Sequence, residues 1–353
     1  MRVLLVRLRL IGDVVFTTPS IRALRTRFPD AHLAYVVEPA AAPVVAGNPH
    51  LNEVIVVPRR RGARRLQDDW TAVARLRQGR FDLAIDLHGG PRSAWLTWLS
   101  GAPRRIGYAI PGRRWMYTDV VARAANLAPR HSALNQCDLL APLGITTCDP
   151  ADAPVEMREE PAAAARVEQR LRDLGIGPDN PIAVIHVSAG NPFRRWPEPS
   201  FAALAAALVR RDPRRRIVIV SGPSDRVAAG AVRDAARADA HAPDGTITAD
   251  EYDLPELRAL VARAAVYIGG DSGPLHVAAT TTTPIVELLG PTLAERSRPW
   301  REGRWFSEVV DAGSLSCRPC HQRRCVPGDF RCLTGITPER VIEAAERAMR
   351  HRV

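Results

Sequence analysis

The sequence contains no lysine, because all 49 of its basic residues are arginine. This absence excludes a P-loop lysine, a Schiff-base lysine for pyridoxal phosphate and a lysine general base. No G-x-G-x-x-G motif follows an apolar run, which argues against a dinucleotide-dependent dehydrogenase, and no D-x-D pair is present to hold a metal ion on a nucleotide diphosphate. Any bound phosphate must therefore be held by arginine side chains, loop N–H groups or helix N-termini.

Long apolar runs are also missing. No stretch approaches the ~18–20 apolar residues of a membrane span. The N-terminal run is too short for a signal peptide and is better interpreted as a buried strand. We therefore expect a cytoplasmic protein. With 353 residues and 46% apolar content, the chain is long enough for two globular domains.

Charge is distributed unevenly along the chain. Residues 1–150 contain 21 Arg against 11 acidic residues, a net charge of +10, whereas residues 151–353 contain 28 Arg against 27 acidic residues, a net charge of +1. The first part is therefore expected to face nucleic acid, an anionic membrane surface or an acidic substrate. Aromatic residues make up only 5% and do not interleave with the arginines, which argues against nucleic acid.

Short apolar runs alternate with amphipathic helical stretches in two series, separated by a looser region at 142–180. This alternation is typical of parallel, doubly wound sheets. The sequence predicts an α/β protein with two Rossmann-like domains, residues 1–170 and 171–353, facing each other across a cleft. The runs expected as strands are 3–6, 33–37, 53–57 and 81–87, followed by 181–187, 215–222, 265–270 and 284–289.

Polar residues follow several of these runs. Asp13 is either a helix N-cap or a carboxylate that accepts a proton from a substrate hydroxyl. The loop at 188–197 (SAGNPFRRWP) is either a solvated loop or a phosphate-binding turn in which backbone N–H groups act together with Arg194 or Arg195.

The segment GDSGPLHVAA at 270–279 carries the densest group of polar residues between apolar strands. One interpretation is a capped helix with a core histidine. The other interpretation is a binding site. In it, the helix start at Gly273 leaves N–H groups free for an anion, and Ser272 bonds a phosphate or a ribose hydroxyl. Asp271 accepts hydrogen bonds from sugar hydroxyls, and His276 reaches a phosphate. Together with GDVVFTTPS at 12–20, the segment indicates an enzyme that handles a nucleotide-activated sugar.

Two further groups are defined by composition. An arginine cluster, which includes Arg59, Arg60, Arg61 and Arg64, is either a solvated basic face or a site for anionic lipid headgroups or a phosphorylated, carboxylated glycan. A C-terminal cysteine group has the spacing C-x2-C-x4-C-x6-C and predicts either a structural zinc site or reduced thiols that pack a loop. Its members are Cys317, Cys320, Cys325 and Cys332, whereas Cys137 and Cys148 are expected to be ordinary core residues.

These motifs resemble glycosyltransferase family 9, the bacterial heptosyltransferases of lipopolysaccharide core synthesis, which have a two-domain GT-B fold. The resemblance runs nearly from end to end of the chain. It rests on MRVLLVRLRLIGDVVFTTPSIRALRTRFP, FDLAIDLHGGPRSAWLTWLSGAPRRIGY, the RRWP loop, GDSGPLHVAA and TPIVELLGPT.

The resemblance implies an inverting, metal-independent transfer from ADP-L-glycero-D-manno-heptose to a Kdo–lipid A acceptor, at the inner face of the inner membrane. Asp13 matches the general base of the family. Arg194 stands where the family usually has a basic residue, often lysine, that contacts the diphosphate, and Ser188 matches a small hydroxyl residue near the phosphates.

The donor-binding D-[ST]-G-x-x-H set of the family is matched by Asp271, Ser272, Gly273 and His276. The basic first domain is then expected to bind the acidic acceptor through the arginine cluster. Two alternatives remain open: a related transferase with another nucleotide sugar or glycan acceptor, and a basic nucleic-acid-binding protein without catalytic activity.

Overall fold

The computed structural model describes residues 1–353 except 61, 124–128, 188–190, 321, 323 and 352–353. The chain divides between Arg158 and Glu159 into two compact units. This division falls earlier than the expected boundary after residue 170, because helix α7 (Pro161–Asp173) packs on the second unit, where its arginines bond Glu256. Among the described helices, none is both long enough and apolar enough to cross a membrane.

The first unit is built on a six-stranded parallel sheet with the order β3-β2-β1-β4-β5-β6, which is the strand order of a Rossmann fold. Its central strands are rich in Val, Leu and Ile and are buried on both faces, as parallel strands require. The strands are β1 (Arg2–Val6), β2 (His32–Val37), β3 (Glu53–Val56), β4 (Leu83–Asp86), β5 (Arg104–Tyr108) and β6 (Asp119–Val121).

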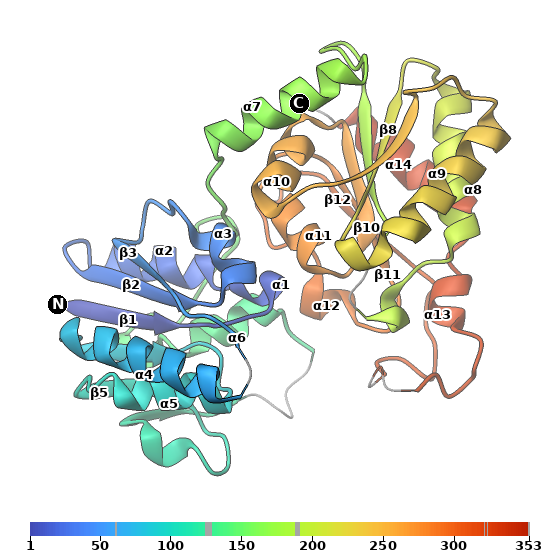
Figure 1. Cartoon of the computed structure of the whole chain (residues 1–353). Helices are drawn as coiled ribbons and strands as arrows, with labels where there is room; N and C mark the ends of the chain where they lie inside the picture. The colour runs from blue at the N-terminus through green and yellow to red at the C-terminus, as the bar shows by residue number, and fades with distance from the viewer. Residues whose placement is uncertain (61, 124–128, 188–190, 321, 323, 352–353) are drawn as a thin grey trace. The chain divides into compact units, whose positions relative to one another are not determined.

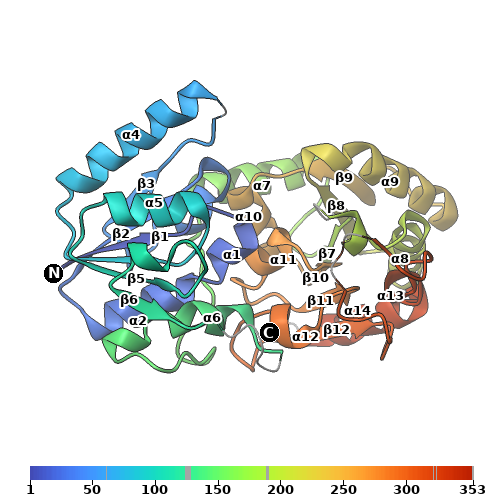
Figure 2. The same cartoon turned by 90° about the horizontal axis from the view of Figure 1, so that it is seen from below.

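Helices cover both faces of this sheet (Figure 1; Figure 2). Helices α4 (Ala63–Gln78) and α5 (Pro91–Leu99) pack on one face, and α2 (Thr18–Arg27) and α6 (Ser132–Asp138) lie on the other. The helical segment after β1 is divided into α1 (Ile11–Val15) and α2, because Pro19 lacks an N–H to continue the hydrogen bonds and the Thr17 hydroxyl bonds the carbonyl of Val14.

The second unit repeats the same strand order in a second parallel sheet, β12-β11-β10-β7-β8-β9. All eight strands expected from the sequence are present, so the prediction of two Rossmann-like domains is confirmed; how the two units face each other stays a prediction. The strands of this sheet are β7 (Ile182–His186), β8 (Arg216–Ser221), β9 (Ile247–Glu251), β10 (Val266–Gly270), β11 (Ile285–Leu289) and β12 (Ser307–Asp311).

Helices α8, α9 and α14 bury one face of the second sheet in a single apolar core, while α10 and α11 pack on the other face. Short helices α3, α12 and α13 complete the two units (Figure 1). Their bounds are α8 (Glu198–Arg211), α9 (Arg226–Ala240), α10 (Leu254–Arg263), α11 (Gly273–Ala278), α14 (Pro338–Arg350), α3 (Ala42–Val45), α12 (Ala294–Ser297) and α13 (Arg331–Thr334).

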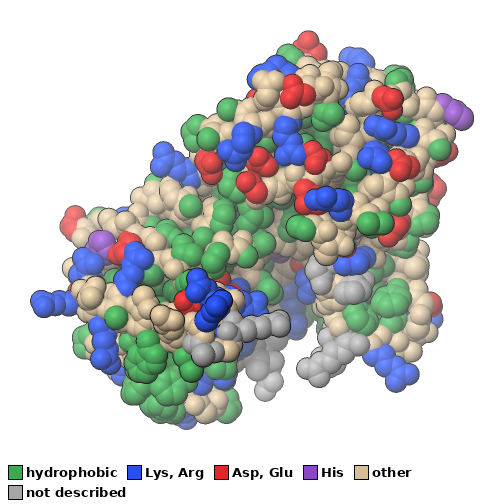
Figure 3. Space-filling model, viewed as in Figure 1, with side chains coloured by type: hydrophobic (Ala, Val, Ile, Leu, Met, Phe, Trp, Pro, Cys, Tyr) green, Lys and Arg blue, Asp and Glu red, His purple; other side chains and the backbone are tan. Residues whose placement is uncertain are grey.

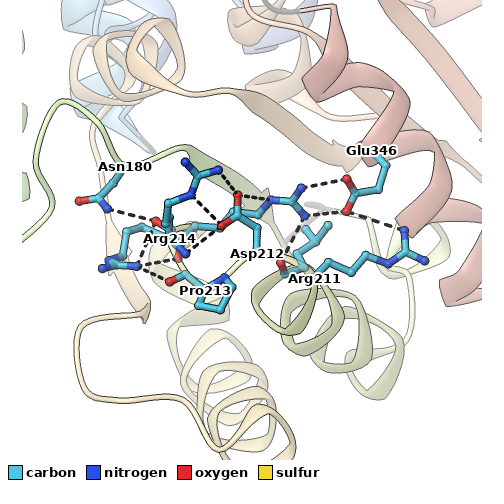
Figure 4. Close-up of polar contacts among 9 residues, drawn as sticks. Asn180, Arg211, Asp212, Pro213, Arg214 and Glu346 are labelled. Carbon is cyan, nitrogen blue, oxygen red and sulfur yellow. Dashed lines mark hydrogen bonds and ion pairs between the residues drawn. The ribbon is translucent and has the colours of Figure 1, made fainter.

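A charged network fixes the last helix to the second unit. Arg215 donates two hydrogen bonds to Glu346 on α14, at 2.6 and 2.9 Å, and a nitrogen of Arg211 lies 3.7 Å from the same carboxylate. Figure 4 shows this network continuing through Asp212 and Arg214. The hydrogen bond from Arg215 lowers the pKa of Glu346, so the carboxylate stays charged and bound across the neutral range.

The expectation that Cys137 and Cys148 are ordinary core residues needs a correction. Both side chains are buried, but their sulfur atoms form a disulfide with the Cα atoms 6.3 Å apart. Cys137 lies on α6 and Cys148 lies 11 residues further along the chain, which is close enough for the loop between them to return to the helix.

Candidate active site

Polar residues, most of them predicted from the sequence, gather at the carboxyl ends of central strands. In the first unit, Asp13 follows β1 and His88 follows β4; in the second, Arg194 follows β7 and Asp271 follows β10. Each of these strand pairs is the point where the strand order of its sheet reverses. Ligands of open parallel sheets bind at that point, outside the carboxyl ends of the strands.

Asp13 is not a helix cap. The N-cap of α1 is Leu10, and no side chain caps that end. The Oδ2 atom of Asp13 instead lies 2.5 Å from the guanidinium of Arg7, and the Asp13 side chain is 37% exposed. Arg7 is buried and also donates to the carbonyl oxygen of Leu87 at 2.7 Å. The carboxylate is therefore held in a fixed direction while it stays open to a ligand.

The loop after β4 is fixed by a buried carboxylate. Asp86 accepts hydrogen bonds from the N–H groups of His88 and Gly89, both at 2.9 Å, and from the hydroxyls of Ser93 and Tyr117 at 3.0 and 2.6 Å. Burial raises the pKa of Asp86 despite these bonds. The network holds the backbone that carries His88 beside the Arg7–Asp13 pair.

His88 is neutral at physiological pH. Burial lowers its pKa to about 4, and the charges of Arg7 and Arg9 act in the same direction, while Asp13 opposes them. A neutral imidazole can donate or accept a hydrogen bond without adding a positive charge. The sequence analysis did not select this residue, although its position directly after a buried strand is the same signal that identified Asp13.

A pocket of about 580 Å³ lies next to these residues in the first unit. Of the predicted arginine cluster, Arg59 and Arg60 line the pocket, Arg64 is exposed outside it, and Arg61 lies outside the described residues. The pocket also includes Arg65 of the same arginine run and two arginines that the sequence analysis missed, Arg9 after β1 and Arg92 at the start of α5. The residues that line it are Leu8, Arg9, Glu38, Arg59, Arg60, Arg65, His88, Gly90, Pro91, Arg92 and Ser93.

Arg92 is the best-anchored cation of this pocket. Its guanidinium lies 2.9 Å from Glu38 and 2.5 Å from Asp69, and it also donates to the carbonyl oxygen of Pro58 at 2.7 Å. Its side chain is only 11% exposed. Arg59, Arg60 and Arg65 reach carboxylates only at 3.6–3.8 Å and are more than half exposed, so an anionic ligand can recruit them.

In the second unit, Asp271 organises the residues around it. Arg194 lies 3.0 Å from its carboxylate, the Thr292 hydroxyl donates to it at 2.8 Å, and the Nε2 atom of His276 lies 3.6 Å away. Burial opposes the ionisation of Asp271, but His276, Arg194 and Thr292 outweigh it and lower the pKa. Asp271 is 5% exposed, and its carboxylate holds Arg194 and His276 beside it; that it binds sugar hydroxyls stays a prediction.

The backbone allows Arg194 to lie against β10. A Cβ atom on Gly270 would lie 3.1 Å from the carbonyl oxygen of Arg194, so a side chain there would push the loop away. The guanidinium of Arg194 also donates to Gln322 at 2.7 Å. Arg195, the second candidate, points elsewhere and pairs with Asp225 at 2.9 Å.

The remaining donor-site candidates are Ser188 and three residues at the start of α11. Ser188 lies outside the described residues. Ser272 is the N-cap of α11 but makes no capping bond, and its buried hydroxyl oxygen has no partner in the described part of the chain. Gly273 begins α11, and His276 is buried on it. A buried hydroxyl without a partner beside Asp271 suits a polar ligand at this end of the sheet.

Glu287 is a further buried acid that the sequence did not reveal. It lies on β11 opposite Gly269, is fully buried, and neither carboxylate oxygen has a hydrogen-bond partner among the described residues. Burial raises its pKa well above the ordinary value, and the charge of Asp271 raises it further. Burial therefore favours the protonated form of this side chain.

The four cysteines of the C-terminal group are free thiols that line one small cavity of about 40 Å³. Burial raises the pKa of Cys332, and Cys320, Cys317 and Cys325 raise it further, which shows that the four lie near one another. As they stand, no three or more His, Cys, Asp or Glu side chains among the described residues are arranged to hold a metal ion. The zinc hypothesis therefore stays a prediction.

The chain is similar to known proteins in sequence and in fold. The family model of glycosyltransferase family 9 (heptosyltransferase) matches residues 70–329. A lipopolysaccharide heptosyltransferase 3 of Escherichia coli is 28% identical over 300 residues, which cover 83% of this chain and 84% of that protein.

Two solved structures share the fold along almost the whole chain. The glycosyl transferase family 9 protein of Veillonella parvula superposes with a TM-score of 0.85 at 24% identity, over 99% of this chain and 98% of that one. The E. coli ADP-heptose lipopolysaccharide heptosyltransferase II superposes with a TM-score of 0.76 at 20% identity, over the same shares of the two chains.

Proposed function

The chain belongs to glycosyltransferase family 9, the heptosyltransferases, and from this premise we propose that it transfers L-glycero-D-manno-heptose from the ADP-sugar to the inner core of lipopolysaccharide, with inversion at the anomeric carbon. The observation that carries the proposal is the Arg194–Asp271 pair at the strand-order reversal of the second sheet. A structurally similar E. coli enzyme is described as an ADP-heptose transferase, which supports the choice of donor.

The second unit binds the donor in this proposal. Arg194 supplies the positive charge for the diphosphate, and Asp271 and Gln322 set the direction of its guanidinium. The unpartnered hydroxyl of Ser272 and the N–H group of Gly273 add neutral donors beside it. Since lysine is absent and no D-x-D carboxylates hold a metal ion, these groups stabilise the leaving ADP without a metal ion.

Asp13 acts as the general base. One oxygen of the Asp13 carboxylate accepts the proton of an acceptor hydroxyl. At the same time the hydroxyl oxygen of the acceptor forms a bond to the anomeric carbon of the heptose. The bond from the anomeric carbon to the diphosphate oxygen breaks, and ADP leaves with the electron pair on the opposite face. Arg7 keeps Asp13 oriented, and neutral His88 is available to hydrogen-bond the acceptor.

The arginine pocket of the first unit binds the acidic acceptor. Kdo carboxylates and core phosphates are planar or tetrahedral anions that suit arginine forks, and Arg92 supplies a firmly anchored cation among more exposed ones. In this proposal the protein works at the cytoplasmic face of the inner membrane, where the lipid-anchored acceptor lies. The arginines converge on a pocket and pair with acids of the same unit, which favours a compact anionic ligand over nucleic acid.

The test is incubation of the purified protein with ADP-heptose and a panel of truncated Kdo–lipid A acceptors, read by mass spectrometry. A heptose added to one acceptor of the panel supports the proposal. Transfer from another nucleotide sugar alone would identify a related transferase of the family. Binding to heparin without any thermal stabilisation by ADP would instead favour the nucleic-acid-binding alternative.

A further inference from the structure

Three tryptophans form a cluster on the surface of the first unit. Trp95 and Trp98 lie on α5, and Trp115 lies in a short helical turn, Arg114–Met116. Their rings pack edge to face, with centroids 5.4 Å apart for Trp95–Trp98 and Trp98–Trp115 and 6.4 Å apart for Trp95–Trp115. Trp95 is 47% exposed and Trp115 is 57% exposed. Figure 3 shows hydrophobic side chains gathered at the lower edge of this unit, over the region of α5.

The cluster is rigid at its base and open at its surface. Trp98 packs against buried Ala94, Met116 and Tyr117, and Tyr117 is tied to the buried Asp86 by its hydroxyl at 2.6 Å. Large aromatic rings that stay exposed on a fixed base are unusual, because burying them in the core would be favourable. A gathered apolar surface of this kind marks an interaction site.

The segment of the chain that carries the cluster contains arginines and no acidic residue. Between Asp86 and Asp119 the sequence has no acidic residue and five arginines. Two of these, Arg113 and Arg114, directly precede Trp115, and neither forms an ion pair with the residues that the structure describes. The surface therefore combines aromatic rings with unpaired guanidinium groups, and its charge is complementary to an anionic partner.

We propose that the cluster of Trp95, Trp98 and Trp115, with Arg113 and Arg114, is the surface by which the protein enters the interface of an anionic lipid bilayer. Tryptophan rings prefer the headgroup level of a membrane, where the ring is shielded and the N–H group stays hydrated. Arginines beside them are attracted by anionic headgroups, and the two signals together give stable binding where one alone is weak.

The position of the cluster on α5 agrees with this assignment. The helix begins at the arginine pocket with Pro91 and Arg92, and Trp95 and Trp98 follow at intervals of three residues, so each side chain lies beside the one before it on the helix surface. The pocket and the cluster thus lie on one rigid element. The inference goes beyond the transfer reaction and does not depend on it, because lipid binding is measured without donor or acceptor.

The experiment is flotation of the full-length protein with vesicles of phosphatidylethanolamine and phosphatidylglycerol, compared with vesicles of phosphatidylcholine alone. We expect binding to the anionic vesicles, weakened about tenfold by the double variant Trp95→Ala/Trp115→Ala. Arg114→Gln should weaken binding about fivefold. Val227→Ser, which removes an 87%-exposed apolar side chain of the second unit, is the matched control and should leave binding unchanged.

Thermal unfolding of each variant shows whether it is folded. If the double variant does not fold, Arg114→Gln and quenching of tryptophan fluorescence by brominated lipids decide the question. Absence of wild-type binding to anionic vesicles, or equal binding by the folded double variant, would overturn the proposal. A third outcome would also overturn it: the wild-type protein self-associates in sedimentation, the double variant does not, and neither protein binds vesicles. The cluster would then be an interface between two copies of the chain.

Discussion

The guanidinium of Arg7 and the carboxylate of Asp13 are 2.5 Å apart, at the carboxyl end of the first strand of the chain. Arg7 is itself held by the carbonyl oxygen of Leu87, at the end of the neighbouring β4. The arginine engages Oδ2 of Asp13, so Oδ1 is the oxygen left to accept a proton from a ligand. A buried arginine thus orients the carboxylate without enclosing it.

Asp13→Asn should keep the fold and the affinity for ADP but lower turnover about 10²-fold or more, because the amide has the shape of the carboxylate and cannot accept the proton. Initial rates with ADP-heptose and acceptor measure the loss, and calorimetry with ADP is the control. A variant with nearly normal turnover would falsify the assignment of Asp13 as the base.

Arg194→Ala should weaken ADP binding about 10- to 100-fold, because a charge-assisted bond to a phosphate typically contributes ~1.5–3 kcal/mol. Isothermal titration with ADP measures the change. Arg210→Ala, on the surface of α8, is the matched control and should bind ADP normally. Unchanged affinity in Arg194→Ala would transfer the role to Arg195 or another group.

The arginine pocket allows a comparison between neighbouring residues. Arg60→Gln should raise the KM for the acceptor about three- to tenfold and leave the KM for ADP-heptose unchanged, since Arg60 lines the pocket. Arg64→Gln should change neither constant, because Arg64 is exposed outside the pocket. Equal effects of the two substitutions on acceptor KM would mean that only the net charge of the segment matters.

Glu287 should make stability depend on pH. Its folded pKa is raised by burial, so the unfolded state ionises first, and the folded protein loses stability as pH rises from the unfolded value of 4.5 towards the folded value. Glu287→Gln should therefore raise the free energy of unfolding by about 1–3 kcal/mol near pH 8 and by much less near pH 4. Denaturant unfolding at the two pH values measures this difference.

Glu346→Gln is the opposite case and serves as the comparison. Its folded pKa is lowered by Arg215, so the pair stabilises the fold above the unfolded pKa and loses that effect as pH falls through the folded pKa. The variant should cost about 1–2 kcal/mol near pH 7 and little in acid. If both variants changed stability equally at every pH, ionisation would not be the cause in either.

The cysteine group provides a test of metal content. We propose that Cys317, Cys320, Cys325 and Cys332 hold one structural zinc ion, which the convergence of four thiols on one cavity supports. Purified protein should then contain about one zinc per chain, and Cys320→Ser should lower both the zinc content and the thermal midpoint. Four freely reactive thiols in zinc-free native protein would instead indicate reduced thiols that pack the loop.

Local patterns were sufficient for the framework of this protein. The apolar runs predicted four strands of each sheet, β1–β4 in the first and β7, β8, β10 and β11 in the second, because most of these strands are buried and leave a continuous apolar signal. They did not predict β5, β6, β9 or β12, in which arginines, glycines and acids interrupt that signal. These segments become strands only through hydrogen bonds to an adjacent strand of the sheet.

By itself, the sequence determined that the chain is an α/β protein with two Rossmann-like series and that its polar residues follow the carboxyl ends of strands. It also determined that arginine replaces lysine wherever a phosphate is bound by a basic side chain. The tertiary structure alone decided the partnerships: Arg7 with Asp13, Arg92 with Glu38, and Cys137 with Cys148. The physical reason is that strand and helix periods are read over a few neighbouring residues, whereas a partner is set by which loops the completed sheet brings together.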